Sequence, residues 1–254
     1  MAASLPTSLS GLRVVEWCDT IPGLYCGRLL AELGADVVKV EMPRKPVRGE
    51  PVEPQRGLTR TLHAYYNAGK RSVSLDSKRV ADLVAAADVF VEDHAPGALA
   101  SDGLSFSSLS LVNPNLVMAS ITPFGQTGPY ARYKAYALNL FHAGGEGYIQ
   151  PGGPGYGAHP DRPPLMAGGN FSESVCGSTA AAGIVAALWR RQRKREGDYI
   201  DLSCQEALMT LGRAELSSFP NAGFVERRRT RYMGLGGLKR TADGWLEMVV
   251  TEPR

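Results

Sequence analysis

The sequence predicts an open, mostly parallel α/β sheet with helices on both faces. The first observation is an apolar strand segment at 12–17, a helical pattern at 23–33 and a second strand segment at 35–41. A strand, a helix and a strand within about thirty residues form a βαβ unit, whose two strands pair in parallel. The second observation is that this alternation recurs further along the chain, which is typical of an α/β domain with an open sheet.

The later elements follow from valine-rich runs and helical periodicity. We expect strands at 71–75, 88–92, 116–121 and 199–202, and helices at 78–87, 107–112, 170–191 and 205–217. Gly34 is expected to end the first helix, and Asn170 or Ser172 to cap the long helix. Small residues between 176 and 183 would let that long helix approach its neighbours closely.

Two segments interrupt the pattern. Residues 144–169 are rich in glycine and proline, and we expect a loop that serves a ligand or covers a site. No strand leads directly into the GGPGYG tract of this loop, so the tract is not expected to bind a dinucleotide. The chain becomes polar after residue 219, and a new strand begins near 243. We predict a large domain over 1–219 and, over 220–254, a linker and the first strand of a small domain that is mostly absent.

The composition is that of an ordinary globular enzyme, with 44% hydrophobic and 21% charged residues among 254. A formal charge of +3 is too slight to predict a nucleic-acid partner. The four cysteines and four histidines are dispersed without ligand spacing, so neither a metal site nor a disulfide framework is expected. No signal peptide is recognisable, and no apolar run approaches the ~20 residues of a membrane span. We expect a cytoplasmic protein with no membrane partner.

Several tracts follow one another in the order of a known family. They are LSGLRVVEW, PGLYCGRLLAELGADVVKVE, NAGKRSVSLD, ADVFVEDHAPGAL, NPNLVMASITPFGQTGPY and GIVAALWRRQRKREGDYIDLSCQEA. Over most of its length the chain resembles family III CoA-transferases of the CaiB/BaiF type, which include formyl-CoA transferase, carnitine CoA-transferases and α-methylacyl-CoA racemase. The resemblance implies a Rossmann-like large domain that binds CoA, two interlocked chains, and acyl-CoA and a carboxylic acid acceptor as substrates. It implies no prosthetic group and no metal.

The resemblance also implies a catalytic carboxylate at the start of the long helix, four residues before a glycine. Glu173 occupies this position, four residues before Gly177, where family members typically carry an aspartate. In the family the carboxylate attacks the acyl-CoA thioester and forms a mixed anhydride, and CoA then passes through the enzyme to the acceptor acid. A carboxylate in a first helical turn is favoured by backbone N–H groups and the helix dipole, although a glutamate there also serves simply as a capping residue.

The expected CoA-binding residues, carried over by position, are Lys39, Glu41, Leu75, Asp76, Lys78, Asp93, His94, Ala95, Lys134 and Tyr136. The resemblance places Lys39 and Glu41 near the adenine end of CoA. Gly234, Gly236 and Gly237 resemble a mobile glycine-rich loop that shields the anhydride from water in some family members. An interdomain hinge is the alternative role for this glycine-rich segment.

Five positions depart from the family pattern. Met42 stands where a basic residue often follows, Asp93 replaces an asparagine, Ser101 an arginine, Ala137 an acidic residue and Glu173 the aspartate. These departures leave open three hypotheses: a CoA-transferase that uses Glu173, a catalytically degenerate partner subunit of an active homologue, and an isomerase or racemase-type reaction on the same fold.

Two further observations bear on the last two hypotheses. The tracts SITPFGQTGPY and HAGGEGY look closest to a subgroup often found as paired subunits, so a homodimer or a heterodimer with a homologous chain is expected. The racemase branch uses a histidine where Tyr136 stands. His142, six residues further on, is expected to be a structural residue.

Overall fold

The computed structural model describes residues 7–41, 59–150, 161, 163, 165–225, 227 and 237–248. The chain divides into two compact units. Unit 1 comprises Met1–Lys134 and Asn170–Cys204, and unit 2 comprises Ala135–Gly169 and Gln205–Arg254. The division into domains at 1–219 and 220–254 stays a prediction.

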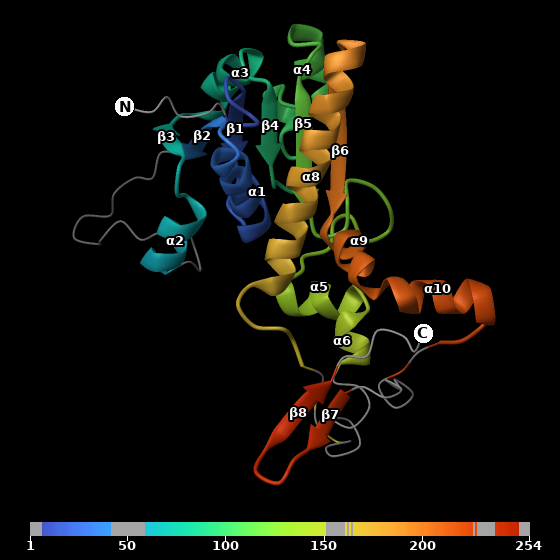
Figure 1. Cartoon of the computed structure of the whole chain (residues 1–254). Coiled ribbons are helices and arrows are strands. Elements are labelled where there is room, and N and C mark those ends of the chain that lie inside the picture. Colours follow the sequence, from blue (N-terminus) through green and yellow to red (C-terminus); the bar gives the residue numbers. More distant parts are fainter. Residues whose placement is uncertain are drawn as a thin grey trace, which may run out of the picture. The chain divides into compact units, whose positions relative to one another are not determined.

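Unit 1 is built on a sheet of six parallel strands (Figure 1). The strands are β1 (Arg13–Trp17), β2 (Asp36–Glu41), β3 (Arg71–Ser74), β4 (Val89–Glu92), β5 (Val117–Thr122) and β6 (Asp198–Ser203). Their order is β3-β2-β1-β4-β5-β6. This confirms the predicted fold class. Because the order reverses between β1 and β4, the crevice at the carboxyl ends of these two strands is where such sheets bind ligands.

Helices cover both faces of this sheet. They are α1 (Ile21–Glu32), α2 (Arg60–Tyr66), α3 (Ser77–Ala85), the 3-10 turn η1 (Ala100–Asp102), α4 (Phe106–Val112) and α8 (Phe171–Lys194). Helices α1 and α8 pack against each other on one face (Figure 1). On the other face, α3 and α4 cover an apolar cluster that includes Val15, Trp17, Phe90 and Met118.

The predicted helices of unit 1 agree with the structure to within a few residues. Helix α1 begins two residues earlier than expected, and Pro22 lies in its first turn. Backbone N–H groups in a first turn have no intrahelical partner, so a proline there costs no hydrogen bond. By length and composition α8 could cross a membrane, but it packs against α1, β5 and β6 as a core helix. Helix α2 was not predicted, because its seven residues are too few to show a clear periodicity.

Unit 2 holds short elements. They are α5 (Ala137–Ala143), α6 (Glu146–Ile149), most of α9 (Cys204–Met209), the 3-10 turn η2 (Thr210–Gly212), α10 (Arg213–Ala222), β7 (Gly237–Arg240) and β8 (Trp245–Met248). The strand predicted near 243 is confirmed as β8, and it pairs antiparallel with β7, which precedes it in the chain.

Two sequence predictions in this unit were wrong. The segment 144–169 was expected to be loop throughout, but it contains α6, and Gly145 at φ +99° makes the turn into that helix. The helix expected at 205–217 is instead divided into α9, η2 and α10. Gly212 has φ −86° and ψ 41°, which is not helical, and this breaks the helical hydrogen-bond pattern.

Candidate functional site

Asp93 follows β4, at the point where the strand order reverses. Its Oδ1 accepts a hydrogen bond from the Asp19 N–H at 2.9 Å. Its Oδ2 accepts from both the backbone N–H and the hydroxyl of Thr20, each at 2.6 Å. Asp19 and Thr20 form the turn between β1 and α1, and Thr20 is the N-cap residue of that helix. The carboxylate therefore binds the end of β4 to the beginning of α1.

The environment of Asp93 makes it titrate in mild acid. Burial raises the pKa of this carboxyl to about 6, although the hydrogen bonds from Thr20 and Asp19 and the charge of His94 act in the opposite direction. At neutral pH the Asp93 carboxylate is therefore an anion that accepts hydrogen bonds from three groups of this chain: the N–H groups of Asp19 and Thr20 and the Thr20 hydroxyl.

Glu173 lies in the first turn of α8 and is half-buried. The predicted cap Asn170 is the N-cap residue, but its side chain makes no capping bond to the helix, and its backbone is left-handed at φ 56°. The Asn170 amide instead donates to the Tyr66 hydroxyl at 3.3 Å. Because the first N–H groups of a helix have no intrahelical partner, the environment of Glu173 favours a negative charge.

Two glycines allow close packing around the first turn of α1: Gly177 on the side of α8 and Gly23 on the side of Cys18 and Asp93. A Cβ at Gly177 of α8 would lie 2.6 Å from the Pro22 carbonyl oxygen, so no larger residue fits without a shift. A Cβ at Gly23 of α1 would lie 3.0 Å from Asp93 Oδ2. The first turn of α1 is thus held between Asp93 on one side and α8, one turn after Glu173, on the other.

Cys204, at the end of β6, interacts with both carboxylates. A hydrogen bond with Cys176 and burial raise the pKa of the Cys204 thiol, and the charges of Asp93 and Glu173 raise it further. Cys18, Cys26, Cys176 and Cys204 are all buried free thiols. Burial also raises the pKa of Cys18 and Cys26, so these thiols are neutral and poor nucleophiles.

A buried ion pair beneath α1 was not predicted from the sequence. Lys70 Nζ lies 2.6 Å from a Glu16 carboxylate oxygen, and both side chains are almost fully shielded from solvent. Lys70 Nζ also donates to the Leu24 carbonyl of α1 at 2.8 Å. Burial raises the pKa of Glu16 and lowers that of Lys70, so each charge depends on the other. The available signal was Glu16 itself, since a charge inside an apolar strand needs a partner.

Four of the expected CoA-binding residues gather at the carboxyl ends of β2 and β3. The Leu75 N–H donates to the carbonyl of Glu41, the exposed last residue of β2, at 3.2 Å. Asp76 caps α3 by accepting from the Arg79 N–H at 3.1 Å. Lys78 is exposed in the first turn of α3. These residues form an accessible polar edge beside the crevice.

Lys39 does not belong to that edge. It is buried within β2, next to Glu16 in the strand register, and its Nζ lies 3.3 Å from the Cys18 carbonyl oxygen, to which it donates. Its ammonium therefore supports the β1–α1 region from beneath. No contact of Lys39 with a ligand follows from this position.

His94 and Ala95 continue from Asp93 along the crevice. The His94 ring packs edge-on against Trp17, with ring centroids 4.5 Å apart. Burial opposes a charge on His94, but the Glu92 carboxylate 3.3 Å from its Nδ1 raises the pKa. Ala95 is exposed. The Glu92 carboxylate thus favours the protonated form of His94 at the carboxyl end of β4.

The remaining expected residues lie at the edge of unit 1 or in unit 2. Lys134 is exposed at the end of the first segment of unit 1, and Tyr136 is exposed at the N-cap of α5 in unit 2. Gly237 begins β7, whereas Gly234 and Gly236 lie outside the described residues. His142 packs against Gly147 and the Phe141 ring in unit 2, consistent with a structural role.

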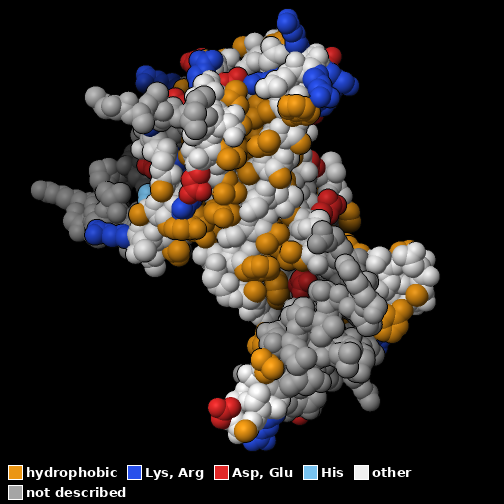
Figure 2. Space-filling model, in the orientation of Figure 1, with side chains coloured by type: hydrophobic (Ala, Val, Ile, Leu, Met, Phe, Trp, Pro, Cys, Tyr) orange, Lys and Arg blue, Asp and Glu red, His pale blue; other side chains and the backbone are white. Residues whose placement is uncertain are grey.

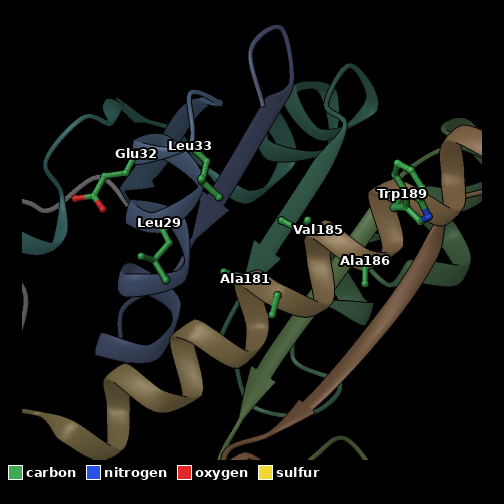
Figure 3. Close-up of a pocket in the computed structure, with 8 residues that line it drawn as sticks. Leu29, Glu32, Leu33, Ala181, Val185, Ala186 and Trp189 are labelled. Carbon is green, nitrogen blue, oxygen red and sulfur yellow. The ribbon is translucent and has the colours of Figure 1, made fainter. Parts of the chain in front are cut away.

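An apolar groove of about 690 Å³ lies on the outer surface of α1 and α8, and Figure 2 shows hydrophobic side chains gathered there. Figure 3 shows its lining: Leu29, Glu32, Leu33, Ala181, Ala182, Val185, Ala186 and Trp189. Ala181 is eight residues after Glu173, which is about 12 Å along the helix. The groove therefore begins about two helical turns away from Glu173.

The chain matches the family model described as CoA-transferase family III over residues 9–254. It is 36% identical over 208 residues to a succinate–glutarate CoA-transferase of Agrobacterium fabrum, covering 77% of this chain and 50% of that protein. It is 34% identical over 250 residues to the succinyl-CoA:(R)-benzylsuccinate CoA-transferase subunit BbsE of Thauera aromatica, covering 94% and 59%. A formyl-CoA:oxalate CoA-transferase of Streptomyces coelicolor is 32% identical over 215 residues, covering 82% and 50%.

Among solved structures, a CaiB/BaiF family protein from Brucella suis is similar with a TM-score of 0.78 and 30% sequence identity. The similarity covers 96% of this chain and 66% of that chain. The chain spans about half the length of the curated relatives that it matches.

Proposed function

The chain belongs to CoA-transferase family III, and on this premise we propose that it transfers CoA from an acyl-CoA to a carboxylic acid through Glu173. One observation carries the proposal: Glu173 stands in the first turn of α8, one helical turn before Gly177, which packs against the first turn of α1. A carboxylate in this electrostatic setting is available as an anionic nucleophile.

The proposed reaction is a sequence of acyl substitutions. A Glu173 carboxylate oxygen attacks the thioester carbonyl carbon of the acyl-CoA, the C–S bond breaks, and CoA leaves as a thiolate. The thiolate then attacks the glutamyl carbonyl of the mixed anhydride, which releases the donor acid and leaves a glutamyl-CoA thioester. The acceptor carboxylate attacks this thioester, and the released thiolate takes the acceptor acyl group and regenerates Glu173.

For the binding of CoA we propose the polar edge formed by Glu41, Leu75, Asp76 and Lys78, together with His94 and Ala95 after β4 and the exposed Lys134. A backbone hydrogen bond already joins Glu41 and Leu75. The Lys78 side chain is exposed, so its ammonium group is accessible to a phosphate group of CoA. As the family resemblance implies, we also propose that Tyr136 contacts CoA and that the segment with Gly234, Gly236 and Gly237 shields the anhydride from water. A cytoplasmic location accords with CoA thioesters as substrates.

The acids named in the relatives guide the choice of substrate. Succinate, glutarate and oxalate are all dicarboxylic acids. We therefore propose a dicarboxylic acid for at least one of the two partners, and choose succinyl-CoA as donor with glutarate or oxalate as acceptor for the first assays.

Glu173→Gln tests the proposal. With succinyl-CoA and glutarate, we expect CoA transfer to fall at least about a thousandfold, because the amide cannot form the anhydride. CoA affinity measured by titration calorimetry should stay within about twofold, since the amide keeps the size of the side chain. Glu173→Asp should keep partial activity, because moving the carboxylate by roughly 1 Å costs about a hundredfold.

Glu206→Gln is a matched control, because Glu206 also lies in the first turn of a helix, α9, and is exposed. It should leave transfer unchanged. Unchanged transfer in Glu173→Gln would refute the catalytic role of Glu173, whatever the control does.

A second function, that of a partner subunit in a heterodimer, has one specific observation in its favour. The relative that covers 94% of this chain is itself described as a subunit. Under this hypothesis the purified chain transfers no CoA alone, and transfer appears only when a homologous chain is added. An isomerase or racemase-type reaction would instead convert a single acyl-CoA without any acceptor acid, and product analysis distinguishes it from transfer.

A further inference from the structure

Asp93 connects elements of unit 1 that are far apart in the sequence. Its carboxylate accepts hydrogen bonds from Asp19 and Thr20, which lie more than seventy residues earlier. Behind this turn there is no room for a side chain at Gly23, where a Cβ would lie 2.5 Å from Cys18 Sγ and 3.0 Å from Asp93 Oδ2. The first turn of α1 therefore rests directly on the Asp93 carboxylate.

The opposite side of this turn of α1 contacts α8. A Cβ at Gly177 would lie 2.6 Å from the Pro22 carbonyl oxygen and 3.0 Å from Tyr25 Cβ. Gly177 follows Glu173 by four residues, about one helical turn. Because packed interiors leave little free volume, a shift of the first turn of α1 must displace the adjoining turn of α8.

The beginning of α8 has no side-chain capping bond from its N-cap residue, Asn170. The Asn170 amide donates to Tyr66 instead. The position of the first turn of α8 therefore depends on what packs against it, and α1 is the helix in closest contact.

We propose that Asp93 is a positioning residue: by fixing the β1–α1 turn it holds the first turn of α1 against α8 and so sets the position of the Glu173 carboxylate. The inference rests on the proposed function of Glu173. It differs from the CoA contact that the family resemblance implies for Asp93, because the carboxylate is directed at N–H and O–H groups of this chain.

Amide hydrogen exchange tests the structural part without any need for activity. In Asp93→Ala we expect exchange to rise about tenfold in peptides covering 18–24, because charge-assisted hydrogen bonds to the turn are lost. The same rise is expected in peptides covering 171–177. Asp93→Asn should give a smaller rise in both, because the amide keeps one acceptor oxygen where the carboxylate uses two.

Asp36→Asn is the matched control. Asp36 is an exposed aspartate at the start of β2, hydrogen-bonded to Arg71 at 2.8 Å, and its replacement should leave both peptides unchanged. A rise in 18–24 without any rise in 171–177 would overturn the proposal, and so would unchanged exchange in both.

Kinetics tests the positioning part. In single turnovers with succinyl-CoA, Asp93→Ala should release CoA about tenfold or more slowly, while its Kd for CoA stays within about twofold. Weaker CoA binding at an unchanged rate would overturn the proposal in favour of a CoA contact. If the wild type itself releases no CoA from any acyl-CoA, the proposed function fails, and the exchange data alone then decide whether Asp93 holds α8 in place.

Discussion

The two faces of the six-stranded sheet differ in what they bury. Beneath α3 and α4 the strands contribute an apolar cluster, with Val15, Phe90 and Met118 as members. Beneath α1 the neighbouring strand positions carry Glu16 and Lys39, in register with each other and both buried. Successive residues of a strand lie on opposite faces of the sheet, so Val15 contributes to the apolar face and Glu16, the next residue, to the charged face.

The two faces therefore contribute differently: the apolar face stabilises the fold, and the charged face positions α1. Most of the apolar face contributes burial of hydrophobic area, which is favourable and independent of pH. It also carries one buried carboxylate, Glu92, at the end of β4 and next to Trp17 in the strand register. The charged face requires desolvation of ions, which costs free energy that the pairing only partly offsets. In exchange, the charged groups fix the position of α1: Lys70 donates a hydrogen bond to the Leu24 carbonyl, and Asp93 accepts hydrogen bonds from the turn before α1. The face that costs stability is also the face that carries the candidate site.

The largest effect is expected from breaking the ion pair on the charged face. Lys70→Ala should lower the free energy of unfolding by about 3–5 kcal/mol, because it leaves the Glu16 charge buried without its partner. Urea unfolding measures this loss. The double variant Lys70→Met with Glu16→Leu removes both charges and should recover most of it. A single variant that loses less than about 1 kcal/mol would show that Glu16 does not need this partner.

The apolar face should respond to truncation but not to pH. Leu104 is fully buried in the cluster beneath α3 and α4, and Leu104→Ala should cost about 3 kcal/mol through lost burial and a cavity. The loss, measured by urea unfolding, should be the same at pH 5 and pH 8. A strong pH dependence would contradict the separation of the two faces.

Asp93 should make the charged face sensitive to pH. Its folded-state pKa of about 6 lies above the usual value, so between about pH 4 and 6 the native state binds this proton and the unfolded state does not. The contribution of Asp93 to stability is therefore greatest on the acid side and falls as the pH rises through this window, by about 2–3 kcal/mol.

The measurement compares thermal unfolding of the wild type with Asp93→Asn from pH 4 to 7. Only the wild type should lose the increment, because the amide does not titrate. The titratable groups whose ionisation is affected by the Asp93 charge are present in both proteins, and they are Glu16, Cys18, His94 and Cys204. Parallel stability curves for the two proteins would rule out a raised pKa at Asp93.

A smaller effect is expected at the contact between α1 and α8. Gly177→Ala places a methyl group 2.6 Å from the Pro22 carbonyl and should cost about 1–3 kcal/mol. Gly183→Ala is the matched control in the same helix, since its methyl would meet only Ile200 side-chain atoms at 3.7 Å. Because alanine favours a helix, Gly183→Ala should be neutral or stabilising by up to about 1 kcal/mol. Equal losses in both would mean that the contact is not tight.

Much of unit 1 could be predicted because buried parallel strands are continuous apolar runs. The strands at Arg13–Trp17, Asp36–Glu41 and Val117–Thr122 were each predicted to within a residue. The short helices α2, α5 and α6 were not predicted, because four to seven residues show only weak periodicity, although α4, also seven residues long, was predicted.

The site was predicted only as a set of positions. Asp93 and its partner Asp19 are 74 residues apart in the sequence, so no local pattern indicates that the carboxylate binds this turn. Lys39 was expected near a ligand but is buried in the sheet, because the alternation of side chains along β2 places it on the face covered by α1. Only folding brings such groups together, and a sequence pattern reports just the element on which each one lies.

Hydroxylamine trapping tests the central claim, a covalent intermediate on Glu173, most directly. The full chain is incubated with succinyl-CoA and other acyl-CoAs, treated with hydroxylamine, digested and analysed by mass spectrometry. We predict a hydroxamate on the peptide that carries Glu173, absent in Glu173→Gln, because both the anhydride and the glutamyl thioester react with the amine. CoA binding without a hydroxamate on that peptide for any donor, or a hydroxamate on a different carboxylate, would contradict the account.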